Sequence, residues 1–464
     1  MRVNQAEQNP RPRYKPYGEY KDSGVEWMGE IPAHWEVKRI KHVATKIGSG
    51  KTPSGGAEVY LNEGIMLVRS QNVHFGGLRL DDVAFVDEAT DREMANTRVL
   101  ENDVLLNITG ASLGRCCLAR LAGRRANVNQ HVCIIRPRQT QFDPSALSSA
   151  LTSNALQAQI FNNENGISRD ALNFVQIGNF AVCKPTLQEQ QAITAFLDRE
   201  TERIDGLVAK KERLIELLQE KRSALITRAV TKGLDPNVPM KDSGVEWLGE
   251  IPAHWEVFSL RRLIAGIEQG WSPVADDRVA GPDEWAVIKL SAVSKGKFLG
   301  DEHKALPAGL APDRRFEIRE GDFLLTRANT PEFVGEVCVA RGVRSGLMLC
   351  DLVYRLNLVT ERVVPEYLSF WLLSRAGRYQ IEVDARGASQ SMVKVSQGII
   401  RAWTVVLPPI QEQRAITEFA DRNAARRDAL VAKVRTAIDR LRELRTALIS
   451  AAVTGKIDVR EEAP

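Results

Sequence analysis

The chain carries the block KDSGVEWMGEIPAHWEV at residues 21–37 and repeats it, with one substitution, as KDSGVEWLGEIPAHWEV at residues 241–257. A second block, LQEQQAITAF from Leu187, returns as IQEQRAITEF from Ile410. The blocks keep their order in both halves, so the chain is an internal duplication. The segments between the blocks have diverged, as expected if one common frame carries inserts with different targets.

The ends of the two halves also correspond. The sequence AVTKGLD at 229–235 runs through a proline-containing linker, 236–240, into the second copy of the first block. The related sequence AVTGKID stands at 452–458, near the end of the chain. We therefore expect the C-terminal end to lie near Lys21, which gives a circular arrangement with a pseudo-two-fold axis between the halves.

Two long helices are predicted after Pro185 and after Pro408, where Ala, Leu, Glu, Lys, Arg and Gln dominate. Apolar residues recur there at alternating steps of three and four, which is typical of a coiled-coil seam. We expect the two helices to pack on each other in antiparallel orientation. The expected helix–helix packing residues are Ile193, Leu197, Ile204, Leu207, Leu214, Leu218, Leu225, Ile416, Leu430, Val434, Leu441, Leu444 and Leu448.

Polar residues interrupt this seam, and they have three interpretations. They fix the register of the pair, they bind other subunits, or they lie solvated at the ends of a stable helical hairpin. A helix over 193–225 would be roughly 50 Å long, which would place two domains at its ends about 10 to 14 base pairs apart on DNA. The polar seam residues are Glu200, Lys211, Lys221, Asn423 and Arg427.

The composition fits a multidomain globular chain of 464 residues, with 44% hydrophobic and 26% charged residues. No apolar stretch is long enough to span a bilayer, and we expect a cytoplasmic protein. The fold class expected is α+β, with two globular α/β domains separated by two long antiparallel coiled-coil helices and an internal pseudo-two-fold repeat. The expected segments are a flexible tail (1–20), a first domain (21–184), a central helix (185–235), a linker (236–240), a second domain (241–407), a C-terminal helix (408–458) and a tail (459–464).

Signs of catalysis and of metal binding are weak. The segment IGSGKTPSGG from Ile47 imitates a phosphate-binding loop, but it has Thr45 where such a loop needs its first glycine. His34 and His254 belong to the repeated block, which favours packing beside the following tryptophans over acid–base chemistry. The six cysteines are scattered without metal-ligand spacing, so we expect buried thiols and no metal site.

The duplicated motifs resemble the specificity subunits of type I restriction-modification systems over nearly the whole chain from Tyr20. Three motifs carry the resemblance: G-x-x-P-x-x-W, N/G-D-x-L-L, and the helix start P-x-x-x-E-Q. Each alone is a weak signal, whereas their duplicated order is specific. They lie at 29–35, 103–106 and 185–190, and again at 249–255, 322–325 and 408–413.

The resemblance implies a non-catalytic subunit that reads double-stranded DNA. Each domain would be a target-recognition domain for one half of a split DNA site, and the two helices would set the unread gap. Two modification subunits would supply methyl transfer from S-adenosylmethionine, and restriction subunits would supply ATP- and Mg-dependent cleavage. No cofactor is expected on this chain itself.

Candidate DNA contacts are polar side chains in the variable segments, because Arg, Lys, Asn and Gln read base edges while Lys, Arg, Ser and Thr bind phosphates. Two alternatives stay open: a coiled-coil scaffold that binds only protein, and a fused nuclease or methyltransferase whose site is unrecognised. The candidates are Lys51, Arg69, Gln71, Asn72, Asn107, Thr109, Asn129, Gln130, Ser168 and Arg169 in the first domain, and Gln269, Lys289, Ser291, Arg327, Asn329, Thr330, Arg386, Ser389, Gln390 and Lys394 in the second.

Overall fold

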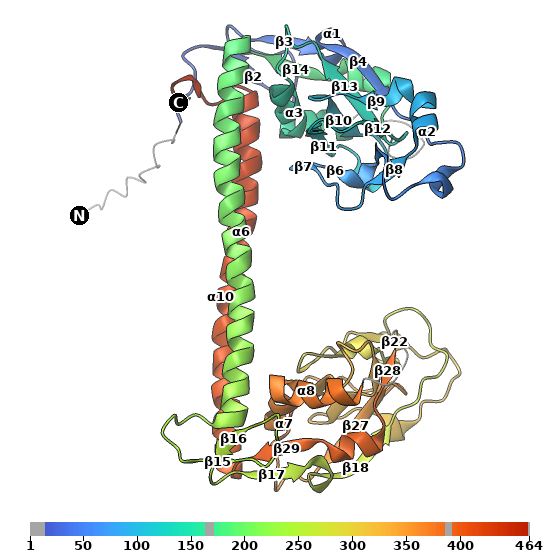
Figure 1. Cartoon of the computed structure of the whole chain (residues 1–464), viewed down its shortest axis with the longest axis vertical. Coiled ribbons are helices and arrows are strands. Elements are labelled where there is room, and N and C mark those ends of the chain that lie inside the picture. Colours follow the sequence, from blue (N-terminus) through green and yellow to red (C-terminus); the bar gives the residue numbers. More distant parts are fainter. Residues whose placement is uncertain (1–13, 163–170, 386–391, 463–464) are drawn as a thin grey trace, which may run out of the picture. The chain divides into compact units, whose positions relative to one another are not determined.

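The computed structural model describes residues 14–162, 171–385 and 392–462. The chain forms two compact units. Unit 1 comprises Met1–Lys211 with Arg435–Pro464, and unit 2 comprises Glu212–Val434. The predicted α+β class and the two long helices, α6 (Leu187–Lys232) and α10 (Ile410–Val453), are confirmed (Figure 1).

Unit 1 contains two four-stranded sheets, with strand orders β11-β10-β13-β4 and β8-β5-β12-β9. The pairing of β5 with β12 is parallel, and the other pairings within these two sheets are antiparallel. The elements before α6 are β1 (Tyr20–Asp22), β2 (Glu30–Pro32), β3 (Glu36–Arg39), α1 (Ile40–Val43), β4 (Ala44–Ser49), η1 (Gly56–Val59), β5 (Ile65–Val68), η2 (Ser70–Asn72), β6 (Val73–His74), β7 (Gly77–Leu78), β8 (Ala84–Val86), α2 (Glu88–Glu93), η3 (Ala95–Thr97), β9 (Arg98–Val99), β10 (Val104–Asn107), η4 (Gly110–Ser112), β11 (Cys116–Leu118), β12 (Ala126–Val128), β13 (Val132–Pro137), α3 (Pro144–Thr152), α4 (Asn154–Asn162), α5 (Phe174–Asn179) and β14 (Ala181–Lys184).

Unit 2 repeats most of this topology, with a four-stranded sheet ordered β18-β27-β23-β25 and a three-stranded sheet ordered β22-β19-β26, and β19 pairs in parallel with β26. Its elements between the long helices are β15 (Met240–Asp242), β16 (Glu250–Pro252), β17 (Glu256–Ser259), η5 (Leu260–Arg262), β18 (Ile264–Gln269), β19 (Ala286–Ile288), η6 (Leu290–Ala292), β20 (Val293–Ser294), β21 (Lys297–Phe298), β22 (His303–Ala305), η7 (Arg314–Phe316), β23 (Phe323–Thr326), β24 (Ala328–Asn329), β25 (Val337–Val339), β26 (Leu347–Met348), β27 (Val353–Leu358), α7 (Pro365–Leu373), α8 (Arg375–Asp384), β28 (Val393–Lys394), α9 (Gln397–Ala402) and β29 (Thr404–Leu407), and η8 (Arg460–Glu462) follows α10.

The D-x-L-L motif forms the central strand of a sheet that is buried on both faces. In β10, Val104 and Leu106 pack into one hydrophobic cluster while Leu105 packs into a second cluster on the opposite face. In unit 2, Phe323 and Leu325 in the same way face one cluster, and the residue between them faces another. Because successive side chains of a strand point to opposite faces, a strand with two cores needs an unbroken apolar run.

The helix seam has a different phase from the expected one. Leu207 and Leu214 are 37% and 41% exposed, and Leu430 and Leu444 are 43% and 49% exposed. The residue that follows each of these leucines is half-buried instead. These residues are Val208, Ile215, Val431 and Arg445. In α6 an additional step of four, from Ile204 to Val208, shifts the phase of the seam, and beyond it steps of three and four alternate again.

The remaining expected packing residues lie inward, buried or half-buried. They are Ile193, Leu197, Ile204, Leu218, Leu225, Ile416, Val434, Leu441 and Leu448. Within unit 1 the two helices also join through an ion pair, in which Arg445 Nε lies 3.0 Å from Asp205 Oδ1. This contact joins a residue early in α6 to one late in α10, as antiparallel packing requires.

The polar seam residues make local contacts. Glu200 is buried and accepts hydrogen bonds from Arg203, one turn further along α6. The Asn423 side chain donates to the carbonyl of Phe419 in its own helix, at 2.8 Å. The other three lie as follows: Lys211 and Arg427 are half-buried, and Lys221 is exposed.

Both ends of the described chain pack onto unit 1. Tyr17 is buried, and the Lys15 carbonyl accepts a hydrogen bond from the Asp458 backbone N–H at 2.7 Å. Val459 is fully buried. Within the two segments expected to be tails, Tyr17 and Val459 therefore pack into the core of unit 1.

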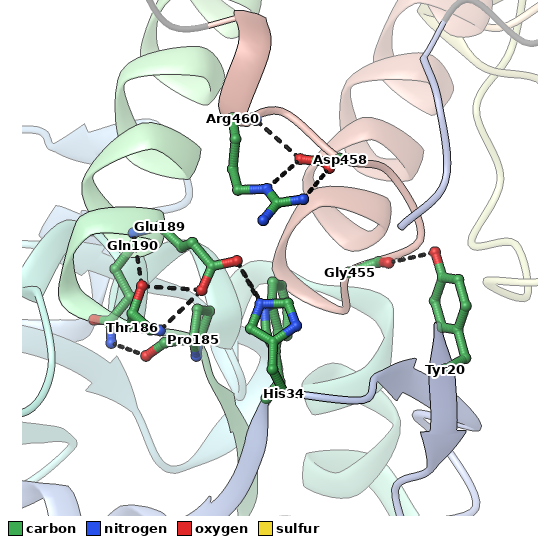
Figure 2. A network of polar contacts seen from close by, with 10 residues as sticks. Tyr20, His34, Pro185, Thr186, Glu189, Gln190, Gly455, Asp458 and Arg460 are labelled. Carbon is green, nitrogen blue, oxygen red and sulfur yellow. Dashed lines mark hydrogen bonds and ion pairs between the residues drawn. The ribbon is translucent and has the colours of Figure 1, made fainter. Parts of the chain in front are cut away.

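The C-terminal end of α10 lies beside the first repeated block. The Tyr20 hydroxyl donates to the Gly455 carbonyl at 2.9 Å, as Figure 2 shows. The Lys456 ammonium donates to the Glu30 carbonyl at 2.5 Å. The prediction that the C-terminal end lies near Lys21 is confirmed.

All six cysteines are buried and free, as predicted. Burial raises the pKa of Cys116 and of Cys133 to about 12, so these thiols stay protonated at neutral pH. In the part of the chain that the structure describes, no helix is long and apolar enough to cross a membrane.

Candidate nucleic-acid interface

The two repeated blocks meet at the start of each long helix. In unit 1, Glu189 Oε1 accepts from the Trp35 indole at 3.3 Å. The same oxygen lies 2.8 Å from His34 Nε2 (Figure 2). In unit 2, Glu412 Oε2 lies 3.0 Å from the Trp255 indole nitrogen and 2.8 Å from the imidazole of the preceding histidine. The repeated motifs are therefore two sides of one joint, which fixes each helix to its own domain.

Gln190 and Gln413, which follow these glutamates, clamp the backbone around the helix starts. Gln190 accepts from the Asp143 N–H at 2.7 Å and donates to the carbonyls of Pro185 and Gln141, at 3.0 and 3.3 Å. Gln413 makes the equivalent three bonds in unit 2. Both glutamines are almost fully buried, so each satisfies three backbone groups that water does not reach.

The joint in unit 1 holds a charged carboxylate. Burial by itself would raise the pKa of Glu189, but hydrogen bonds from His34, Thr186 and Trp35 outweigh it and lower the pKa below the ordinary value of 4.5. Thr186 and Glu189 also form a reciprocal capping box at the start of α6, through bonds of 3.2 and 3.3 Å. The ionised form of Glu189 therefore stabilises unit 1.

Glu189→Gln is expected to destabilise unit 1 in a pH-dependent way. A carboxyl group with a lowered pKa stabilises the fold above its ordinary pKa of 4.5, and this contribution is lost as pH falls through the lower folded value. The difference in melting temperature between wild type and variant should be constant near neutral pH and shrink below about pH 4.5. Thermal melts followed by circular dichroism from pH 3 to 8 measure this difference. A difference in melting temperature that widens on acidification would contradict the lowered pKa of Glu189.

Unit 1 carries a polar edge where several strands begin or end. Hydrogen bonds tie the loops of this edge together: Gly50 N–H donates to the Asn129 carbonyl at 3.1 Å, and Asn129 N–H donates to the Val68 carbonyl at 3.2 Å. The Asn107 amide donates to the carbonyl of Ser70 at 2.8 Å. The loops after β4, β5 and β10 and the turn before β13 thus form one surface, called here the reading edge of unit 1.

A chain of polar contacts runs along this edge. The Thr52 hydroxyl bonds to the Gln130 amide, whose nitrogen lies 3.0 Å from His131 Nε2. The other ring nitrogen of His131 lies 2.6 Å from Thr109 Oγ1. His131 and Thr52 were not among the residues expected from sequence. The only signal for them was their position beside candidate residues.

The structure divides the candidates of unit 1 into three groups. Lys51, Arg69, Gln71, Thr109 and Gln130 are exposed or half-buried on the reading edge. Asn72, Asn107 and Asn129 are buried, and their side chains bond to backbone groups of neighbouring loops, so in this structure they hold the backbone of the edge in place. Ser168 and Arg169 lie outside the described residues.

Unit 2 has an equivalent edge with different side chains. Trp271 N–H donates to the Leu349 carbonyl at 3.0 Å, and Arg327 N–H donates to the Leu352 carbonyl at 2.9 Å. The Arg327 guanidinium lies 5.5 Å from the centre of the Tyr354 ring. The exposed or half-buried candidates are Gln269, Lys289, Ser291, Arg327, Asn329, Thr330 and Lys394, and those outside the described residues are Arg386, Ser389 and Gln390.

Gly50, which imitated part of a phosphate-binding loop, is required by packing. A Cβ atom there would lie 1.6 Å from the Val128 carbonyl oxygen. The corresponding residue of unit 2, Gly270, would place a Cβ 2.4 Å from the carbonyl oxygens of Leu349 and Cys350. These glycines let the loop approach the neighbouring backbone in both units.

Comparisons with known proteins agree on one family. Residues 32–217 match the family model of the type I restriction modification DNA specificity domain. The chain is 28% identical over 197 residues to the type I restriction enzyme EcoEI specificity subunit of Escherichia coli. This match covers 42% of this chain and 33% of that protein. It is 23% identical over 459 residues to the EcoKI specificity subunit of Escherichia coli strain K12, covering 92% of this chain and 90% of that one.

A solved structure shows the same fold. A chain from a study of complex assembly and conformational transition in the type I R-M system superposes with a TM-score of 0.65 at 15% sequence identity. The match covers 92% of this chain and 99% of that chain. The family match, the relatives and the duplicated motifs point the same way, and the chain is similar to the type I restriction-modification specificity subunits.

Proposed function

We propose that this chain gives a type I restriction-modification complex its DNA sequence specificity, with each unit reading one half of a two-part site. One observation carries the proposal: the two units share a topology and a helix joint, but their reading edges carry different side chains. Where unit 1 has Lys51 and Thr52 after the close-packed glycine, unit 2 has Trp271 and Ser272. A common frame with two different edges suits two different half-sites.

The chemistry of the edges suits duplex DNA. Amide and guanidinium groups such as those of Gln71, Gln130 and Arg327 match base edges in the major groove. Ammonium and hydroxyl groups such as those of Lys51 and Thr330 suit phosphates, which position a protein without reading sequence. Phosphate contacts should also make DNA binding weaken with increasing salt concentration.

The other parts of the chain suit an assembly role. The paired helices α6 and α10 would set the unread gap between the half-sites and dock two modification subunits. This chain would not catalyse; S-adenosylmethionine would bind the modification subunits, and ATP with Mg²⁺ would bind restriction subunits. Among the described residues no group of three or more His, Cys, Asp or Glu side chains is arranged to hold a metal ion. Action on chromosomal DNA would place the complex in the cytoplasm.

The experiment is to co-express the full chain with its modification subunit and to map methylated bases in host DNA by single-molecule sequencing. We expect a two-part motif with an unread gap. Gln130→Ala should relax one half of the motif and Arg327→Ala the other. Absence of methylation together with absence of DNA binding by the purified complex would reject the proposal and favour a scaffold that binds only protein.

A further inference from the structure

An acidic residue lies against two candidate DNA-contacting side chains of unit 1. Asp82 stands just before β8, which pairs antiparallel with β5, so it faces the residues that follow the end of β5. The Gln71 amide nitrogen donates to the Asp82 carboxylate. The Arg69 guanidinium donates to the Asp82 carbonyl at 2.8 Å, and its Nη2 lies 3.5 Å from the carboxylate. Arg69 also stacks over Tyr60, 5.5 Å from the ring centre.

Unit 2 repeats this arrangement with other residue types. Glu302 stands just before β22, which pairs antiparallel with β19. The Ser291 hydroxyl donates to the Glu302 carboxylate at 2.8 Å, and the Lys289 ammonium lies 3.9 Å from it. The Lys289 backbone N–H also donates to the Glu302 carbonyl at 2.8 Å. A basic residue and a shorter polar residue, two positions apart, thus share one carboxylate in both units.

The spacing is the same in the two units although the residue types differ. The carboxylate of each unit follows its basic residue by 13 positions and the second polar residue by 11. All three positions have diverged between the halves, from Arg to Lys, from Gln to Ser and from Asp to Glu, while their contacts are kept. Coincidental surface pairs would not keep both spacing and contacts through such divergence.

A carboxylate on a surface that approaches DNA carries a cost. It repels phosphates, and exposed ion pairs contribute little to folding stability. Asp82 is highly exposed, with 80% of its side chain accessible. Asp82 therefore contributes little to the stability of the core. Its hydrogen bonds with Arg69 and Gln71 indicate that its role is to hold these donor side chains.

We propose that Asp82 and Glu302 are positioning residues of the two reading edges. Each carboxylate holds its neighbouring donors, Gln71 with Arg69 in one unit and Ser291 with Lys289 in the other, in a fixed direction toward base edges. A long side chain that is already ordered loses less conformational entropy on binding, and a donor fixed in direction discriminates better between bases. The inference rests on the proposed reading of half-sites.

The test uses the full chain in complex with its modification subunit and measures affinity for the mapped site and for sites with one base pair replaced. Asp82→Asn should reduce discrimination by about tenfold at positions of one half-site only. Glu302→Gln should do the same in the other half-site only. Overall affinity for unrelated DNA should rise slightly in both variants, because a negative charge is lost.

Two neighbouring residues provide matched controls. Asp81→Asn and Asp301→Asn remove the same charge one position away, from side chains that are also exposed. They should raise affinity for unrelated DNA to a similar extent and leave discrimination unchanged. Equal loss of discrimination in the control variants, or loss in both half-sites at once, would overturn the positioning role.

A double variant separates positioning from direct base contact by the carboxylate. If Asp82 acts through Gln71, the double variant Gln71→Ala/Asp82→Asn loses less discrimination between sites than the sum of the losses in the two single variants. Additive losses would show that the carboxylate reads DNA independently and would overturn the inference. A wild-type complex without any two-part site would instead reject the proposed function itself.

Discussion

Gly50→Ala is expected to destabilise unit 1 by about 3 kcal/mol, the upper range for overpacking. The new methyl group would lie 1.6 Å from the Val128 carbonyl oxygen, which is backbone and has no rotamer to change. The loop after β4 must therefore move away, and the hydrogen bond from Gly50 N–H to the Asn129 carbonyl must break. Urea unfolding of the purified chain measures the loss in stability.

The substitution should also affect DNA recognition, because the displaced loop carries Thr52, which bonds to the base-reading candidate Gln130. One half of the methylation motif should relax while the other stays intact. Gly48→Ala is the matched control, since a Cβ atom there would meet nothing within 4 Å. Equal stability of the two variants would contradict the close approach seen at Gly50.

Gln413→Ala is expected to cost about 3 kcal/mol, because each buried polar group left without a partner costs about 1–3 kcal/mol. The Val364 N–H and the carbonyls of Arg362 and Pro408 would lose bonds of 2.8, 2.9 and 2.9 Å. Gln190→Ala should cost a similar amount in unit 1, because its three bonds are equivalent. Unfolding curves of each variant against wild type give the values.

The control for this pair is Gln191→Ala, one position along α6, whose side chain is exposed. Its unfolding free energy should stay within about 0.5 kcal/mol of wild type. Equal losses of unfolding free energy in Gln190→Ala and Gln191→Ala would mean that the hydrogen bonds of Gln190 to the backbone contribute nothing to stability.

The sequence predicted the features that depend on repetition and on apolar pattern. The duplicated blocks indicated two similar units. The helices after Pro185 and Pro408 followed from composition. The phase of the seam could not be settled in the same way. A seam that continues from Ile204 to Leu207 and one that continues to Val208 both include Lys211 and Leu218, and they differ only at the positions between these residues.

The reading edges were predicted less well, because one residue type serves two purposes. Asn107 and Gln130 both follow the pattern of a polar residue at the end of a strand. The first is buried and ties the β10 end to the Ser70 carbonyl, and the second is exposed. Asp82 and His131 act through partners that are distant in sequence or unremarkable in type, so only the folded arrangement shows them.

The two units differ in when their cores can be completed during synthesis. Unit 2 is built from one continuous stretch, Glu212–Val434. The core of unit 1 includes Leu448, Ala452 and Val459, which are synthesised after the whole of unit 2. Unit 1, though begun first, must wait for these residues, and unit 2 can complete its core before it. A nascent chain that stops short of Val459 would expose the unfinished apolar face of unit 1 to chaperones and proteases.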